Sequence, residues 1–473
     1  MNHGLILGSF LLSILLLVHF SSQRRPLSSE APLDVDDNLP APWAGYASSA
    51  FSLSGIFGAF LGMFLILGWS AMLGIAIGVI LSLVMVRSAI TRANPETFEE
   101  FLRKRRFCTV QSCHLLLWLF LGLAQLWFAA SELVLLREIS IRGLGLGPRH
   151  ATALALSIAL IVYFYCLLGG YDAVFRSDVV QFAGMATMCI WIAYLSLTSP
   201  DISIPVDQHM APPREFWSFG IIMSRPWKLA LNMAISIPIG ATGLLGTPGT
   251  WKRVFLALRR GSKYNSFAIL VVAGVLPFAL LSPVLWRLRN SITQELPLDF
   301  LFTLGDSRAF SLALLIGMIS AFMSAFNSSI VVASHIFMTK PTPQGNSPLS
   351  GLDMYRISLC IGFALIIVTS LTVFNQGANP YIIGNFMVGP FCILGGLILG
   401  TSFLERPFSG QGLFGIVLAF LVGWFAYMAN LVLKTNTGSS ASISQVESMP
   451  VGTLLFVLTA GIAWLSREKV RKT

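Results

Sequence analysis

The sequence is poor in charged residues. Of 473 residues, 31 are Lys or Arg and 21 are Asp or Glu, so charged residues make up 11% of the chain. Soluble globular proteins carry about 25% charged residues. This scarcity excludes a soluble globular protein. Since 55% of the residues are hydrophobic, we expect an all-α integral membrane protein in a lipid bilayer.

The patterns of metal sites and of enzymes are also absent. The six cysteines fall almost entirely within apolar segments, and no pair has zinc-ribbon spacing. The proline-rich segment 198–227 holds four residues that could suggest catalysis, but they lack metal-ligand spacing on a helix: Asp201, Asp207, His209 and Glu215. No soluble stretch is large enough for a catalytic domain. We therefore expect no organic cofactor and no enzymatic activity.

Long apolar segments dominate the sequence. A membrane helix needs about 20 mostly apolar residues. About thirteen segments meet this requirement, near 4–20, 46–67, 69–87, 109–136, 150–168, 174–197, 228–246, 267–287, 308–338, 355–374, 380–401, 411–433 and 450–466.

The basic residues predict the orientation in the membrane. The net charge of +10 does not indicate nucleic-acid binding, because Lys and Arg gather in short loops, most densely in 87–106 and 252–263. Such loops face the cytoplasm. With thirteen helices, we expect a multi-pass protein of the cell membrane with its N-terminus outside and its C-terminus in the cytoplasm. Segment 4–20 could instead be a cleaved signal peptide, but no Lys or Arg precedes it.

Two of the predicted helices are rich in glycine and proline. Segment 46–67 contains Gly55. Segment 228–246 and the residues directly after it contain a larger cluster: Pro238, Gly240, Gly243, Gly246, Pro248 and Gly249. Unwound backbone is tolerated in a membrane only where it faces protein or a water-filled site. Glycine also serves close helix packing, which is the alternative interpretation. Because the two segments are five helices apart, we predict a core of two five-helix inverted repeats, each starting with a broken helix.

The stretch Tyr165–Gln181, YCLLGGYDAVFRSDVVQ, carries a sequence motif. It has a turn at Gly169–Gly170, an apolar pair, and then Ser177, Asp178 and Gln181. This order resembles the signature of the sodium/solute symporter family, which has a leucine-transporter-like fold. Three further segments are similar to that family: 248–263, 318–337 and 379–400. The resemblance covers most of 46–433 and identifies the chain as a divergent member.

The resemblance implies a secondary active transporter that moves a small organic solute with a sodium ion. In the family, sodium lies between the first broken helix and the helix matching 308–338, held by two adjacent hydroxyls and backbone carbonyls. Here the hydroxyl pair falls on Ser324 and Ala325, so one oxygen is missing. Ser328 lies one turn on, and on the same helix face as Ser324. The implied cation site, with sodium at Ser324 and Ser328, comprises Asp178, Ser324, Asn327, Ser328, and carbonyls near Gly45 and Ser48.

Two of these assignments have simpler alternatives. An intramembrane serine such as Ser324 often bonds to its own helix carbonyl. Asp178 could form an ion pair with Arg176 that only fixes the loop, although intramembrane carboxylates are more often functional.

The implied solute site has few polar side chains. It comprises Ser52, Gly55, Gly240, Gly243 and Gln125. Glu132 is another polar residue of the same segment as Gln125, and we expect it near the outer face, in contact with water. The alternative to a sodium-coupled carrier is a degenerate relative: a sodium-independent or proton-coupled carrier, or a solute sensor.

These expectations divide the chain into three parts. Residues 1–45 form an N-terminal helix and a polar linker, and 46–401 form the inverted-repeat transporter core. Residues 402–473 form C-terminal transmembrane helices and a basic tail.

Overall fold

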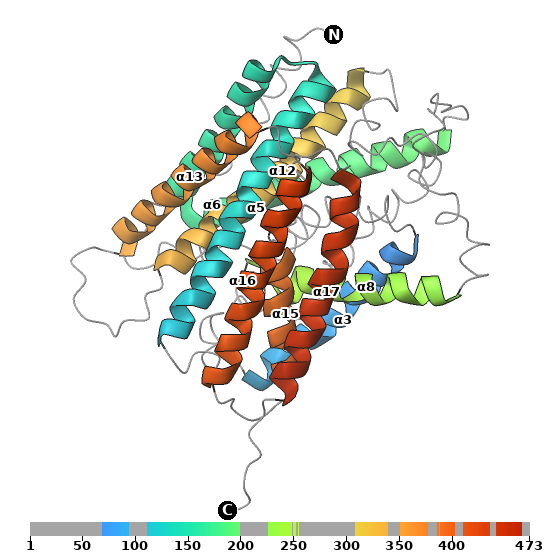
Figure 1. Cartoon of the computed structure of the whole chain (residues 1–473). Helices are drawn as coiled ribbons and strands as arrows, with labels where there is room; N and C mark the ends of the chain where they lie inside the picture. Colours follow the sequence, from blue (N-terminus) through green and yellow to red (C-terminus); the bar gives the residue numbers. More distant parts are fainter. Residues whose placement is uncertain are drawn as a thin grey trace, which may run out of the picture.

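The computed structural model describes residues 69–93, 111–198, 226–247, 249–251, 254, 308–338, 351–376, 386, 388–402, 410–435 and 441–465. The regular structure of this part is helical (Figure 1). Its helices, in chain order, are α3 Trp69–Ala93, α5 Gln111–Leu144, α6 Pro148–Thr198, α8 Pro226–Leu245, α12 Arg308–Met338, α13 Gly351–Gln376, α15 Val388–Ser402, α16 Gly410–Thr435 and α17 Ala441–Leu465.

The predicted apolar segments coincide with these helices. The segment expected at 308–338 has the same bounds as α12, and most others differ by a few residues at each end. The last helix begins at Ala441 rather than near residue 450, because it runs on through Pro450. Segments 4–20, 46–67 and 267–287 lie outside the described residues, so the number of thirteen spans stays a prediction.

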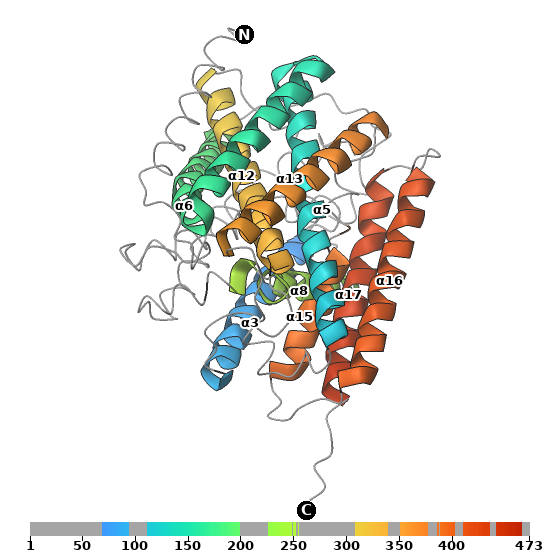
Figure 2. The same cartoon turned by 90° about the vertical axis from the view of Figure 1, so that its left-hand side faces the viewer.

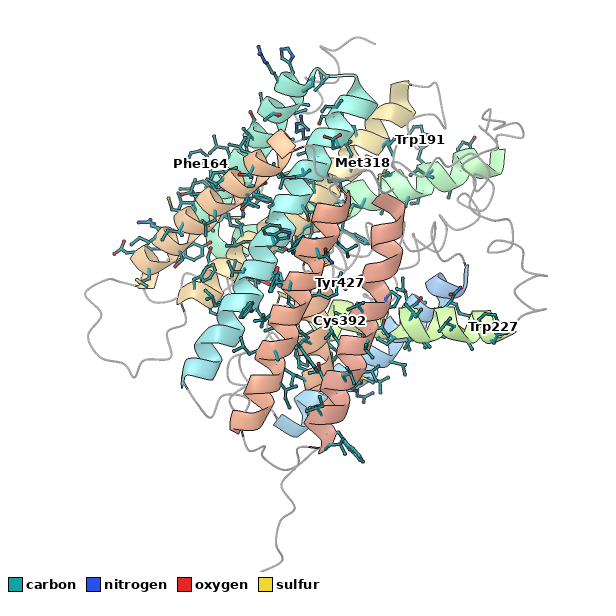
Figure 3. The ribbon with its side chains drawn as sticks, in the orientation of Figure 1. Phe164, Trp191, Trp227, Met318, Cys392 and Tyr427 are labelled. Atoms are coloured by element: carbon teal, nitrogen blue, oxygen red, sulfur yellow. The ribbon has the colours of Figure 1, made fainter. Side chains whose placement is uncertain are left out.

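Four of the described helices are long and apolar enough to cross a membrane. Their apolar spans are Leu119–Ile141, Pro148–Tyr171, Leu312–Phe337 and Leu352–Phe374. Of the span in α12, 94% is buried inside the protein, against 33% and 39% in α13 and the first half of α6. Phe164 of α6 lies at the outer edge of the molecule and is 50% exposed, whereas Met318 of α12 is 3% exposed (Figure 3). Helix α12 is therefore the centre of this part of the protein.

Helices α5, α6, α12 and α13 form one packing group around α12. The contacts of two glycines show how these helices run relative to one another. Gly122 of α5 faces Phe337 of α12, while Gly362 of α13 faces both Leu126 of α5 and the hydroxyl of Ser334 of α12. Helices α5 and α12 are therefore antiparallel, and α13 lies along one side of the pair. Figure 2 shows α6, α12 and α13 in the upper part of the molecule, and α5 running from there into the lower part.

Helices α3, α8, α15, α16 and α17 form the second group. Helices α3 and α8 cross where glycines allow the backbones to touch: a Cβ atom on Gly78 would meet the carbonyl of Ile237, and one on Gly240 the carbonyl of Ile75. Helices α15 and α17 approach in the same way at Gly396 and its neighbours. Helix α16 lies beside α17 (Figure 1), and Figure 2 shows this pair at one edge of the molecule.

The break in the second glycine-rich helix lies at the C-terminal end of the glycine- and proline-rich cluster that the sequence predicted, and not at Pro238. Helix α8 continues through Pro238 as far as Leu245, and the chain leaves the helix at Gly246 and Thr247. Helical backbone returns at Gly249, where the Thr250 amide donates to the Thr247 carbonyl at 3.0 Å. A hydroxyl of α17, that of Thr453, donates to the carbonyl of Ile235 at 2.7 Å, next to the proline. This external donor stabilises the turn that Pro238 weakens.

Candidate functional site

The centre of the motif stretch is a sharp bend in α6. Gly170 has φ +55° and ψ −142°, a backbone conformation that only glycine adopts without strain, so α6 consists of two helices that meet there. The turn predicted at Gly169–Gly170 is confirmed. Tyr165 lies about one turn before the end of the first half, and Ser177 and Asp178 lie in the second half.

The second half of α6 packs against α12, and polar side chains meet at this contact. Asp178 and Ser324 are both buried, and the Ser324 hydroxyl donates to Oδ1 of Asp178 at 3.0 Å. A hydrogen bond to a buried carboxylate stabilises a fold by about 1.5–3 kcal/mol. Ser324 therefore bonds to a carboxylate across the interface, rather than only to its own helix.

Asn327 forms hydrogen bonds with several members of this cluster. Its Nδ2 donates to the hydroxyl of Tyr165 at 3.0 Å and to Oγ of Ser177 at 3.1 Å, and lies 3.4 Å from Oδ1 of Asp178. Its Oδ1 accepts from the Ser328 hydroxyl at 2.9 Å. Because Tyr165 and Asp178 lie on opposite sides of Gly170, Asn327 joins the two halves of α6 across the bend.

The four side chains predicted for the cation site are thus brought together. Asp178, Ser324, Asn327 and Ser328 form one buried cluster, and its oxygens are those of a carboxylate, two hydroxyls and an amide. Such hard oxygen donors suit cations like sodium. Their role as ligands stays a prediction. Ala325, where the family has a second hydroxyl, is buried and adds no oxygen.

Sequence reasoning missed two members of the cluster. Tyr165 and Ser177 both accept from Asn327, but neither was predicted to take part. A signal existed for each, since Ser177 precedes Asp178 in the motif and Tyr165 lies one turn before the glycines. Only the bend at Gly170 brings them to the same side chain.

Beyond the cluster, α6 and α12 come very close. Gly184 faces the hydroxyl of Ser320, and Gly317 faces Met188. Gln181 lies between Asp178 and Gly184 and is fully buried, and neither atom of its amide group has a hydrogen-bond partner within the described residues. The motif glutamine is therefore an unsatisfied polar group one turn from the carboxylate.

The residues predicted for the solute site are only partly described. Gly240 packs against α3, whereas Gly243 is exposed, and no atom lies within 4 Å of the place a Cβ atom would take there. Gln125 is buried in α5, and its Nε2 has no partner among the described residues. Gly45, Ser48, Ser52 and Gly55 lie outside the described residues. Within the described part, no group of three or more His, Cys, Asp and Glu side chains could hold a metal ion.

In sequence, the chain matches no protein-family model and no curated protein. In structure, it is similar to the substrate-bound outward-open state of a Na⁺-coupled sialic acid symporter, with a TM-score of 0.63 and 15% identity over 98% of each chain. It also matches MHP1, a nucleobase-cation-symport-1 family transporter with bromovinylhydantoin bound, at a TM-score of 0.47 and 12% identity over 95% of this chain and 97% of that one. A manganese transporter of Eremococcus coleocola matches at 0.45 and 10%, over 90% and 94%.

The first of these similarities establishes the fold. At 15% identity, a TM-score of 0.63 over nearly the whole of both chains shows a common arrangement of helices. The predicted leucine-transporter-like fold is thereby confirmed, and that neighbour is a transporter rather than an enzyme, in agreement with the expectation for this chain. With the apolar helices described above, the conclusion is that the chain is a multi-pass membrane protein with a transporter fold.

Proposed function

We propose that the chain is a secondary active transporter that couples inward sodium movement to symport of a small organic solute by alternating access. The observation that carries this proposal is the buried hydrogen bond between Ser324 and Asp178, beside the bend at Gly170. The similarity in fold to a sodium-coupled symporter supports it. The motif in Tyr165–Gln181 supports membership of the sodium/solute symporter family.

The buried carboxylate of Asp178 is a negatively charged group that would attract a sodium ion. An ionised side chain inside a membrane protein is costly, and it is retained where it serves an ion path or a relay. Asp178, Ser324, Asn327 and Ser328 offer oxygens that would hold the ion, with carbonyls near Gly45 and Ser48 completing the set. Each sodium ion that enters down the membrane potential supplies about 2.3 kcal/mol per 100 mV.

The architecture proposed for this function has two five-helix inverted repeats within 46–401 and about thirteen spans in all. The N-terminus would be outside and the C-terminus in the cytoplasm. The solute would bind at mid-depth near Ser52, Gly55, Gly240, Gly243 and Gln125. Of these, Gly243 has the open surroundings that a solute site requires, whereas Gly240 is in contact with α3.

One observation favours a second candidate function. The Nδ2 atom of Asn327 already lies among the oxygens of Tyr165, Ser177 and Asp178, and Ala325 supplies no hydroxyl. An amide that satisfies these oxygens could hold the cluster together without sodium. The candidate is a sodium-independent or proton-coupled carrier, or a solute sensor.

Thermal unfolding of the purified protein in sodium chloride and in potassium chloride at equal ionic strength tests the proposal. An ion that binds only the folded state at 100 times its dissociation constant stabilises it by about 2.7 kcal/mol. We expect a sodium-specific rise in the unfolding temperature that disappears in Asp178→Asn and Ser324→Ala. Ser334→Ala is the matched control, because that buried α12 hydroxyl donates to its own helix, to the Ile330 carbonyl at 2.7 Å.

The same experiment separates the two candidates. Equal unfolding temperatures in sodium and potassium would contradict sodium coupling and favour the second candidate. Uptake into proteoliposomes would then be measured with a pH gradient in place of the sodium gradient.

A further inference from the structure

Glu132 of α5 is a second carboxylate at membrane depth. It lies near the middle of the apolar span Leu119–Ile141 of α5, nine residues before the end of that span. The charged residues at that end are Arg137 and Glu138, which pair with each other. A carboxylate in the middle of a span is by default a candidate functional group.

Glu132 points into the protein rather than toward lipid. Leu123, which is 42% exposed, lies nine residues earlier, about two and a half turns, and therefore on the opposite side of α5. The residues that share the side of Glu132 are buried, namely Leu121, Gln125, Phe128 and Leu136. Glu132 itself is only partly buried.

No described residue neutralises Glu132. Within the described part of the chain, its carboxylate has no ion pair or hydrogen bond. Arg137 is engaged elsewhere: it pairs with Glu138, donates to Thr152 at 3.0 Å and covers the ring of Phe374.

Two further polar groups share this environment. Gln125 lies on the same side of α5 as Glu132, about 10 Å away along the helix axis. On α12, Ser329 is fully buried. Neither Nε2 of Gln125 nor Oγ of Ser329 has a hydrogen-bond partner among the described residues. Unsatisfied buried polar atoms are rare in native proteins, and each calls for a partner.

The helix geometry brings the three side chains to one side of the α5–α12 pair. Ser329 is about 140° around α12 from Ser334, which faces α13, and about 140° from Ser324, which faces α6. Because Gly122 is level with Phe337 on the antiparallel partner, Ser329 is level with Ala130, between Gln125 and Glu132. We call these residues, Gln125, Glu132 and Ser329, the polar face.

We infer that the polar face binds the solute, and that Glu132 selects solutes carrying a positively charged ammonium group. This inference rests on the proposed transport function and specifies its substrate class as small organic cations and zwitterions. A cation from solution supplies the charge that the protein does not provide to Glu132. The Gln125 amide and the Ser329 hydroxyl hydrogen-bond to the polar remainder of the solute.

The test measures charge selection at the polar face itself. Gln125→Cys and Ser329→Cys are made separately in the full chain, and the reaction rates with a cationic and an anionic methanethiosulfonate are compared, with the native thiols as background. A unit charge about 10 Å away changes the ratio of these rates by tenfold or more. We expect the cationic reagent to react faster, and the preference to fall at least tenfold with Glu132→Gln. Glu138→Gln, which removes a paired carboxylate of the same helix, is the matched control and should leave the ratio unchanged.

Protection experiments identify the kind of cation. Choline and ethanolamine should slow modification of the introduced cysteine, whereas sorbitol should not. Protection by sodium chloride alone would assign the polar face to an inorganic ion and overturn the inference. Absence of charge selection, or of protection by either ammonium compound, would also overturn it. Sodium-specific thermal stabilisation through Ser324 is measured independently of charge selection at the polar face. A negative result at the polar face would therefore overturn the substrate class and leave the proposed transport function standing.

Discussion

The contact between α6 and α12 and the contact between α3 and α8 are built in different ways. At α6–α12, Asp178, Ser324 and Asn327 exchange hydrogen bonds between buried polar side chains. At α3–α8, Gly78 and Gly240 let the two backbones touch, and packing supplies the stability. Packed backbones have one arrangement, whereas hydrogen-bonded side chains can change partners when an ion or a proton arrives. The first contact therefore suits a conformational switch, and the second suits a rigid unit.

The largest expected effect comes from breaking the rigid contact. Gly240→Leu would force the new side chain into the Ile75 carbonyl, and we expect a loss of at least about 3 kcal/mol of stability or failure to fold. Gly243→Leu on the same helix is the control, because nothing lies within 4 Å of the position. The stability of both variants is measured by thermal unfolding. Equal losses of stability in Gly240→Leu and Gly243→Leu would show that α3 and α8 are not held by close packing.

Loss of the amide of Asn327 should come next. Asn327→Ala removes the donor shared by Tyr165, Ser177 and Asp178, and a buried acceptor without its donor costs about 1–3 kcal/mol. We expect a loss of about 2–3 kcal/mol by thermal unfolding. Ser329→Ala, which removes a hydroxyl without a partner among the described residues, should change stability by less than about 0.5 kcal/mol. A small effect of Asn327→Ala would mean that the cluster is held mainly by other contacts.

The bend in α6 gives a smaller effect. Gly170→Ala places a Cβ atom at φ +55°, which costs about 1–3 kcal/mol. Since the bend aligns Tyr165 with Asp178, the variant should also weaken any sodium-specific stabilisation. Gly147→Ala, where the nearest atom would be 3.7 Å from the new Cβ, is the control and should be nearly neutral. An unchanged unfolding temperature in Gly170→Ala would show that the bend tolerates other conformations.

The smallest effect is expected at the contact between α8 and α17, where a side-chain hydroxyl hydrogen-bonds to a close-packed helix. Thr453→Val keeps the shape but removes the hydroxyl that donates to the Ile235 carbonyl, so about 0.5–1.5 kcal/mol of stability should be lost. A loss above about 2 kcal/mol in thermal unfolding would show that α17 contributes more to α8 than one hydrogen bond.

Sequence alone predicted much of this fold because membrane helices are long and apolar. The bounds of α12 and the turn at Gly170 followed from composition and from the glycine pair. The glycine- and proline-rich cluster predicted a break, but it did not show that α8 continues through Pro238 to Leu245. There a hydroxyl of α17, two hundred residues away in the chain, donates to the Ile235 carbonyl. A contact so distant in sequence leaves no local signal.

The candidate site also combines features with a local sequence signal and features that depend on distant contacts. Asp178 and Ser324 were predicted to belong together because both match a family motif, and the structure places them 3.0 Å apart. Tyr165 was not predicted, because its approach to Asn327 depends on the bend angle. Glu132 was expected near the end of a segment bounded at residue 136, whereas α5 runs on to Leu144 and its apolar span runs to Ile141.

The position of Asn327 across the bend has a thermodynamic consequence. One side chain contacts both halves of α6 as well as the carboxylate, so occupancy at Asp178 and the angle at Gly170 cannot change independently. Linkage requires the effect to be reciprocal: if straightening α6 weakens cation binding by a given factor, the bound cation opposes straightening by the same factor. The free energy that couples the ion to the shape of the protein can therefore be measured from either end.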